Sequence, residues 1–227
     1  MSHYTVMVKY QGKIDNYIEK VAELLEPYNE QISVTPYVTH YKSKQKEYLK
    51  KRLDELLDEL KEIINTNDKK QYNMDRCKEE YARLSKITAG IYWEELTGGD
   101  KLDKDGNATS TYNPDSKWDW YTVGGRWSGL LNLKKNKFGI EGESGVRDNR
   151  KGIDIAYFKD IDWSKMKDFN TYAVLDENGW HEASKMGWFG VSYNQTEDET
   201  TWASKFKARF LDTCDRNTVI VIVDCHI

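Results

Sequence analysis

The 227-residue sequence is long enough for one large domain, and its net charge of -4 offers no bulk positive charge for general nucleic-acid binding. Charged residues make up 32% of the chain, but aromatic residues make up 13%, which excludes a disordered chain with too little apolar area to fold. We therefore expect a folded domain with an aromatic-rich core and a strongly polar surface.

The cysteines and the apolar runs of the sequence indicate the cellular compartment. The three cysteines show no C-x-x-C spacing, which argues against a disulfide framework or a zinc knuckle. The opening residues lack the apolar run of a signal peptide, and no stretch approaches the roughly 20 apolar residues needed to span a bilayer. We expect a cytoplasmic protein without membrane contact.

The first part of the chain alternates between strand and helix signals. Residues 4–10 are rich in β-branched and aromatic side chains, which predicts a strand. Residues 14–25 carry apolar side chains at helical spacing, and Pro27 is expected to end this helix. Residues 31–41 are predicted to be extended.

A charged insertion follows. Residues 44–64 carry one apolar stripe on an otherwise charged helix, and a second helical segment covers about 73–87. Together they predict an antiparallel helical hairpin inserted at 43–87. This hairpin is either a solvated structural element or an arm that binds a partner protein or a second copy of the chain.

The remainder is predicted to be mostly β structure. The acidic run 103–107 lacks EF-hand spacing and is expected to be a turn. The uninterrupted β-branched run at 218–227 is typical of a buried central strand. The other expected elements are strands at 128–134, 153–158, 172–175 and 180–182, with a hairpin turn at 176–179, and a helix at 201–211.

These elements predict a single α+β domain over residues 1–227. We expect a mostly antiparallel sheet with helices packed on one face, because the chain opens strand–helix and closes helix–strand. A ferredoxin-like arrangement, extended by the inserted hairpin, is the first expectation.

The segment Asn113–Trp127 is the richest candidate site. In an extended conformation, Trp118 and Trp120 would share one face. Its two glycines permit close approach of a ligand to the backbone, and Arg126 offers a planar fork for a phosphate or carboxylate. These groups fit a nucleotide-type pocket, although buried tryptophans and a glycine turn would serve packing equally well.

Two histidines add candidate acid–base groups. His181 follows a predicted hairpin turn, and His226 lies at the end of the last strand beside Asp224. Flanking a phosphate, they could cleave a phosphoester without a metal. The H-x-T and H-x-S motifs of two-histidine phosphodiesterases are absent, and metal binding by these residues with Asp119 has no supporting local spacing.

No cofactor is expected. The candidate catalytic residues are His181 and His226. The candidate ligand-binding residues are Lys117, Trp118, Asp119, Trp120, Tyr121, Gly124, Gly125, Arg126, Trp127, Trp188 and Asp224.

Several of these segments together resemble an uncharacterised family of phage and prophage proteins. The resemblance is carried by Asn113-Pro-Asp-Ser-Lys-Trp-Asp-Trp-Tyr121, Gly124-Gly-Arg-Trp127, Gly179-Trp-His-Glu182, Met186-Gly-Trp-Phe-Gly190 and Val223-Asp-Cys-His-Ile227. It covers most of residues 113–227 and both ends of the chain. It implies a phage origin and a location in the host cytoplasm, and it implies no activity.

Three functions follow as hypotheses. The first is a phage accessory protein, by analogy a counter-defence factor, that binds a small nucleotide-like or phosphorylated ligand. The second is a metal-independent phosphoester hydrolase of nucleotide signals that uses His181 and His226. The third is an inhibitor of a host protein that acts through the 43–87 hairpin. A homo-oligomer remains open in each case.

Overall fold

A computed structural model describes residues 2–65, 71–144, 152–186, 192–193 and 197–227. The chain forms two compact units, one from residues 1–33 with 113–227 and the other from residues 34–112. The inserted unit is therefore longer than the predicted hairpin at 43–87. None of the described helices is both long and apolar enough to cross a membrane.

The first unit is built on an eight-stranded, mostly antiparallel sheet, so the predicted α+β class is confirmed. Its strands are β1 (His3–Gln11), β5 (Trp120–Gly125), β6 (Ile140–Glu141), β7 (Glu143–Ser144), β8 (Ile153–Tyr157), β9 (Ala173–Asp176), β10 (Gly179–Glu182) and β13 (Thr218–His226). The order is β10-β9-β1-β13-β5-β7, with β8 beside β13 and β6 beside β8. Every residue of β13 is buried, which confirms the predicted central strand.

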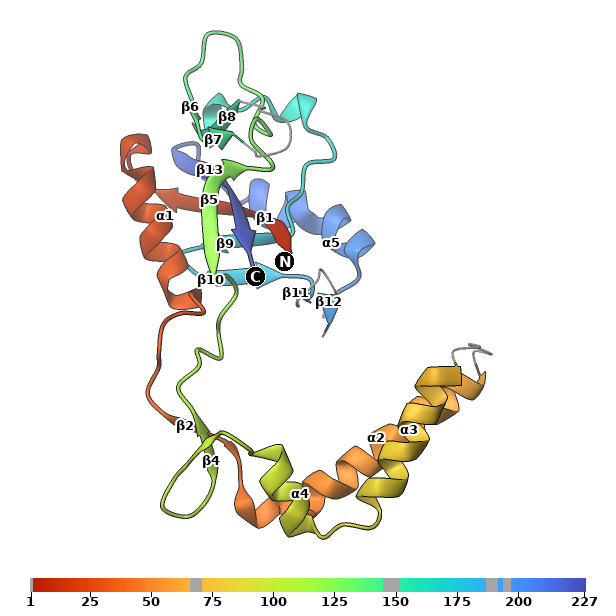
Figure 1. Cartoon of the computed structure of the whole chain (residues 1–227). Helices are drawn as coiled ribbons and strands as arrows, with labels where there is room; N and C mark the ends of the chain where they lie inside the picture. The colour runs from red at the N-terminus through yellow and green to blue at the C-terminus, as the bar shows by residue number, and fades with distance from the viewer. Residues whose placement is uncertain (1, 66–70, 145–151, 187–191, 194–196) are drawn as a thin grey trace. The chain divides into compact units, whose positions relative to one another are not determined.

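The two faces of the sheet are covered by different helices (Figure 1). On one face, Val6 and Val8 pack in a cluster with Val21 and Leu25 of α1 (Tyr17–Leu25). On the other face, Met7 packs in a cluster with residues of α5 (Glu199–Phe206) and of the π-helical turn Lys207–Leu211 that follows it. Adjacent strand residues point to opposite faces, so both faces are buried. The expectation of helices on a single face is therefore wrong.

Short helices and turns complete this unit. The 3-10 turns are Ile14–Asn16, Glu26–Tyr28, Phe158–Asp160 and Trp163–Lys165, and β11 (Lys185–Met186) pairs with β12 (Ser192–Tyr193). The predicted hairpin is confirmed: β9 and β10 pair antiparallel around the turn at 176–179.

The strand predicted at 128–134 is absent. Ser128 and Gly129 instead form a turn, with Gly129 at φ 83°, and only Leu133 makes an isolated bridge. The cause is the buried Asp154, which accepts hydrogen bonds from the Ser128 hydroxyl at 2.7 Å and the Gly129 amide at 2.7 Å. A carboxylate that binds consecutive polar groups of a loop offers them an alternative to a strand ladder.

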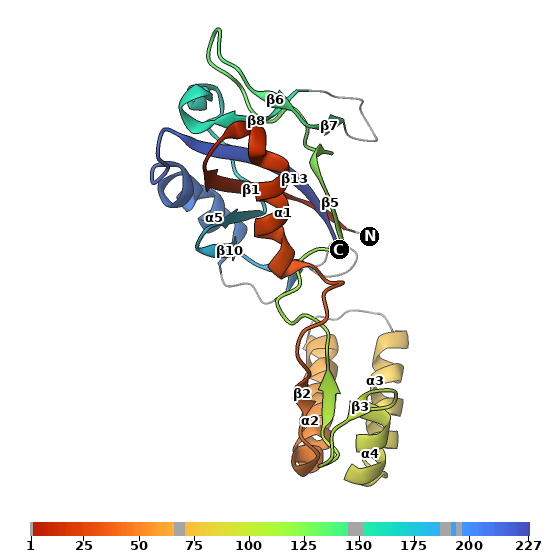
Figure 2. The ribbon, with the colours of Figure 1, turned by 90° about the vertical axis from the view of Figure 1, so that its left-hand side faces the viewer.

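The second unit joins a small sheet to three helices (Figure 2). Its elements are β2 (Tyr37–His40), a 3-10 turn (Lys42–Lys44), α2 (Gln45–Asn65), α3 (Gln71–Leu84), α4 (Ala89–Leu96), β3 (Lys101–Leu102) and β4 (Ala108–Ser110). Leu56, Cys77 and Leu84 form its buried core. The predicted pair of helices is present, and the predicted turn at 103–107 joins β3 to β4, with the Asp103 carboxylate accepting hydrogen bonds from the Asp105 and Asn107 amides at 2.9 Å each.

Candidate functional site

The candidate site lies at one end of the large sheet, where β1 begins and β13 ends; Figures 1 and 2 both show these two ends close together. His3 of β1 stands opposite His226 of β13, and His226 stands opposite Trp120 of β5. Side chains at paired positions of neighbouring strands project from the same face. Register therefore brings two imidazoles and an indole into one row across three strands.

The first imidazole is fixed by a buried carboxylate. Nδ1 of His3 lies 2.8 Å from Oδ1 of Asp224, which is 2% exposed. The second oxygen of Asp224 accepts a hydrogen bond from the backbone N–H of Arg126 at 2.9 Å. Asp224 therefore orients the His3 ring and ties the start of the 126–129 turn to the central strand.

The second imidazole has its own carboxylate partner. Nδ1 of His226 lies 2.6 Å from Oδ1 of Asp119, and the Asp119 amide donates to the His226 carbonyl at 3.0 Å. The Asp119 side chain is 37% exposed and that of His226 is 11% exposed, so this pair reaches the surface through its carboxylate. We call His3–Asp224 and His226–Asp119 the two dyads.

The two dyads face each other. The ring centroids of His3 and His226 are 4.9 Å apart with a T-shaped arrangement, and Trp120 lies 6.1 Å and 6.5 Å from them. Within the described part of the chain, neither Nε2 atom has a hydrogen-bond partner, and neither is among the buried polar atoms that lack one. Each Nε2 is therefore unpaired and not completely enclosed, although His226 as a whole is only 8% exposed.

This arrangement can transfer protons. A ring whose Nδ1–H is held by a carboxylate presents Nε2 as a base when neutral and as an acid when protonated. Two such rings side by side can take a proton from one oxygen and deliver a proton to another. Trp120, half exposed at 50%, supplies a flat apolar surface beside them.

The glycine pair of the predicted motif serves the carboxylates rather than a ligand. Gly124 has φ 83° and Gly125 has φ 56°, which favours glycine at both positions. A Cβ on Gly124 would lie 2.5 Å from Oδ2 of Asp154, and a Cβ on Gly125 would lie 2.5 Å from Oδ2 of Asp224. The glycines let two buried carboxylates approach the backbone closely.

Part of the predicted motif belongs to the core. Trp118 is buried, donates from Nε1 to the Leu25 carbonyl at 2.9 Å and contacts the Tyr121 ring on the α1 face. Trp120 lies with His226, whose even-numbered position on β13 belongs to the opposite face, so the prediction that the two tryptophans share a face is wrong. Trp127 packs against the α5-side core.

Lys117 is also occupied. Its Nζ lies 2.6 Å from a carboxylate oxygen of Glu182, and the other oxygen of Glu182 accepts from Trp180 Nε1 at 2.8 Å. Its role as a phosphate ligand is thereby weakened. The side chain of Arg126 is exposed and forms no ion pair with the described residues. Trp188 lies outside the residues that the structure describes.

His181 does not meet His226. It pairs with Asp176 at 3.2 Å and contacts the Phe210 ring. Strand register places His181 three strands and four residues away from His226, which amounts to roughly 20 Å at ordinary strand spacings. The predicted His181–His226 pair is therefore wrong, and His3 takes the position that sequence reasoning gave to His181.

His3 was missed because its signal is not local. It is the first residue of β1, and only the pairing of β1 with β13 places it opposite His226. One local signal was available: side chains alternate between the two faces of a strand, so Asp224 and His226 of the last strand must lie on the same face.

Cys225 lies on the opposite face from the dyads, in the cluster with α1. Burial first, and the nearby Asp224 charge second, raise the pKa of its thiol well above the ordinary value. The thiol is therefore held protonated, which is unsuited to a nucleophile.

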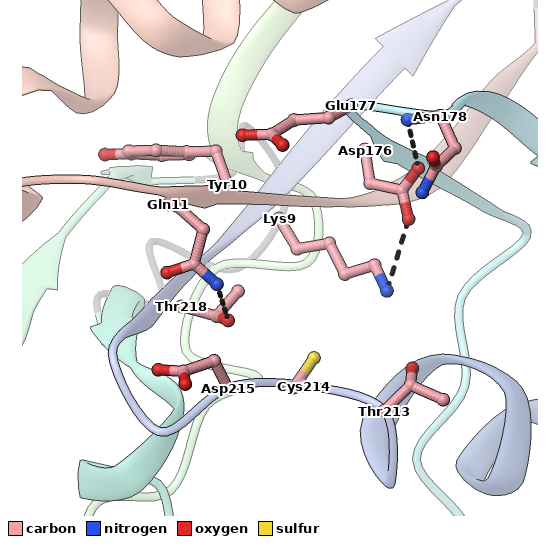
Figure 3. Close-up of a pocket in the computed structure, with 10 residues that line it drawn as sticks. All are labelled: Lys9, Tyr10, Gln11, Asp176, Glu177, Asn178, Thr213, Cys214, Asp215 and Thr218. Atoms are coloured by element: carbon pink, nitrogen blue, oxygen red, sulfur yellow. Dashed lines mark hydrogen bonds and ion pairs between the residues drawn. The ribbon is translucent and has the colours of Figure 1, made fainter.

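An open pocket of about 190 Å³ lies at the other end of β1 (Figure 3). Within it Lys9 pairs with Asp176 at 3.2 Å, and Gln11 donates to the Thr218 hydroxyl at 2.8 Å. The pocket contains none of the dyad residues, so the hollow and the acid–base groups are separate features of this unit.

Among the described residues, no group of three or more histidine, cysteine and acidic side chains is arranged to hold a metal ion. Comparison of the chain with protein-family models, curated proteins and solved structures finds no match in any of the three. The two dyads are therefore the feature of the chain from which a function can be inferred.

Proposed function

We propose that this chain binds a nucleotide-like phosphorylated ligand at the two dyads and cleaves a phosphoester in it by acid–base catalysis. The observation that carries the proposal is the pair of imidazoles with centroids 4.9 Å apart, each held through Nδ1 by its own carboxylate. One Nε2 removes a proton from the attacking oxygen, and the other protonates the leaving oxygen.

The surroundings of the dyads suit such a ligand. Trp120 provides a face on which a base can stack, and base–aromatic stacking contributes about 1–3 kcal/mol per base. The Arg126 amide donates to Asp224, which holds the Arg126 backbone beside the cluster. The exposed guanidinium of this residue can bind a phosphate with two parallel hydrogen bonds. In this proposal Trp120 and Arg126 bind the base and the phosphate, and the dyads transfer the protons.

The ligand class is proposed by analogy with counter-defence factors of phages, since the resemblance itself implies no activity. In a phage accessory protein with a counter-defence role, a nucleotide immune signal in the host cytoplasm would be the natural ligand. Sequestration without cleavage uses the same residues and is the second candidate. Recovery of intact ligand after denaturation of a saturated complex would favour sequestration.

The test is a panel of cyclic and linear nucleotides, with binding followed by thermal stabilisation and products by mass spectrometry. His3→Gln and His226→Gln should each lower turnover by about 10²–10⁴-fold, because each removes one proton-transfer group. His181→Gln is the matched control, since this histidine also pairs with an aspartate but lies outside the cluster. Unchanged turnover in both cluster variants, or no binding across the panel, refutes the proposal.

A separate role in protein contact is proposed for the inserted unit. Leu57 and Ile64 of α2 stand seven residues apart, with Ile64 66% exposed, so apolar side chains recur on one exposed stripe. The proposed occupant is a second copy of the chain, because two like helices pack along apolar residues that recur every seven positions. Light scattering should show a dimer that Ile64→Lys dissociates, and a monomeric unaltered protein would contradict this role.

A further inference from the structure

If the dyads cleave a phosphoester, as proposed above, their geometry also bears on which oxygen attacks the phosphorus. That oxygen belongs either to water or to the substrate itself, and the two cases make different demands on the site.

Most carboxylate oxygens and both Nδ1 atoms of the dyads are already used in hydrogen bonds that orient the imidazole rings. Both oxygens of Asp224 are engaged, one by His3 and the other by the Arg126 amide. One oxygen of Asp119 is engaged by His226. Within the described residues, the two Nε2 atoms are the ring nitrogens of the dyads without a hydrogen-bond partner, and neither is completely buried, so they are the atoms left to exchange protons.

One side of the cluster is open. Asp119 and Trp120 border it and are 37% and 50% exposed, respectively. An attacking water must be held in line by several polar groups, and apart from the two Nε2 atoms, which transfer protons, only the second oxygen of Asp119 is left in the dyads to hold it. A hydroxyl that the substrate carries next to the phosphorus needs only removal of its proton, and such tethering gives effective concentrations of about 10⁵–10⁸ M.

We infer that the substrates are ribonucleotide phosphodiesters in which a ribose hydroxyl adjacent to the scissile phosphate is the nucleophile. The Nε2 of one histidine takes the proton of the 2′-hydroxyl while its oxygen forms a bond to phosphorus. The bond from phosphorus to the 5′-oxygen of the next nucleoside breaks, and the Nε2–H of the other histidine protonates that oxygen. The products are a 2′,3′-cyclic phosphate and a nucleoside with a free 5′-hydroxyl, and no water is consumed.

The open side also bears on substrate length. A phosphodiester has a nucleoside on each side of the reacting phosphate, and the exposed Trp120 can stack against one base while the other nucleoside extends outward. The site therefore accepts dinucleotides and longer chains, in line with a surface cluster rather than an enclosed cavity.

The experiment compares three matched 3′–5′ dinucleotides on the full chain: ribo, 2′-deoxy and 2′-O-methyl. The ribo form should be cleaved, and the other two should be cleaved at least 100-fold more slowly. The 2′-O-methyl form should bind and inhibit competitively, because it keeps the base and phosphate contacts. In mass spectra, the two products should sum to the mass of the substrate, without an added water.

The variants separate chemistry from structure. His3→Gln and His226→Gln should abolish cyclic-phosphate formation yet keep binding of the 2′-O-methyl dinucleotide, and His181→Gln should leave both unchanged. Comparable cleavage of the 2′-O-methyl or 2′-deoxy form, or initial products heavier by one water, overturns this inference and leaves the proposed phosphoester cleavage standing. Failure to bind or cleave any nucleotide overturns the proposed function itself.

Discussion

The close approach of Asp154 to Gly124 gives a sharp test of the packing around the glycine pair. The Gly124→Ala variant introduces a Cβ that would lie 2.5 Å from Oδ2 of Asp154 and 2.9 Å from the Glu143 carbonyl oxygen. The same change forces an L side chain to adopt φ 83°. Both effects destabilise the folded state.

The magnitude can be built from these two contributions. A left-handed backbone conformation costs a non-glycine residue about 1–2 kcal/mol, and overpacking by one methyl group costs about 1–3 kcal/mol. We expect Gly124→Ala to lower the free energy of unfolding by about 2–5 kcal/mol. For a unit of this size, that corresponds to a fall in melting temperature of roughly 4–20 °C.

The matched control is Gly99→Ala in the other unit. Gly99 also has a left-handed backbone, at φ 94°, but no atom lies within 4 Å of its added Cβ. It should therefore show the backbone cost of about 1–2 kcal/mol without the packing cost. Calorimetry and urea denaturation, with each transition assigned by hydrogen exchange, measure both variants in their own units.

A double-mutant cycle completes the test. Removing the carboxylate with Asp154→Ala should make the added methyl of Gly124→Ala less costly, giving an interaction energy of about 1–3 kcal/mol. Strict additivity of the two changes, or equal losses for the Gly124 and Gly99 variants, would refute the close-packing argument.

Three further predictions concern the stability of each unit. Burial raises the pKa of Asp154 above 3.8 despite its hydrogen bonds, so the stability that this group contributes is present at low pH and falls as the pH rises from 3.8 through the raised pKa. Asp154→Asn should remove this part of the pH dependence of the free energy of unfolding in urea titrations, and an unchanged profile would contradict the prediction. Leu56→Ala should destabilise the inserted unit by about 2–5 kcal/mol, because its side chain is fully buried, and hydrogen exchange should quicken in α2 and α3 but not in β13. Replacing residues 34–112 by a linker of about 4–6 residues should leave the large sheet folded, because backbone hydrogen bonds from Glu30 to Trp118 and from Lys117 to Tyr28 already join the two flanking segments. A product that binds a hydrophobic dye and lacks near-ultraviolet circular dichroism would contradict this prediction.

Local patterns predicted the individual elements well. The β-branched run of β13 and the aromatic, β-branched β1 identify themselves, because few other conformations bury such residues on both faces. The apolar stripe of α2 and the turn at 176–179 are equally local signals. The side of the sheet on which each helix packs was not predictable in this way, since it depends on the path of the chain between the strands.

The candidate site shows the same division. Asp119, Trp120, Asp224 and His226 were found from composition and strand position, and the structure brings them together. His3 was not found, because its partner lies at the far end of the sequence and nothing near it marks the pairing. The glycine pair was assigned to a ligand because the two buried aspartates that press against it are also distant in sequence.

The pairing of Ser2 with Ile227 has a practical side. Each donates an amide hydrogen bond to the other's carbonyl at 3.1 Å, one residue beyond the two imidazoles. A purification tag attached next to Ser2 or Ile227 would lie at the edge of the row formed by His3, His226 and Trp120, where it can shield these side chains or contribute its own histidines to an assay. The β3–β4 turn around Asp105 is exposed and belongs to the unit that does not contain this row, so an affinity handle can be inserted there instead. Activity measured with an end-tagged protein should be repeated after the tag has been cut away.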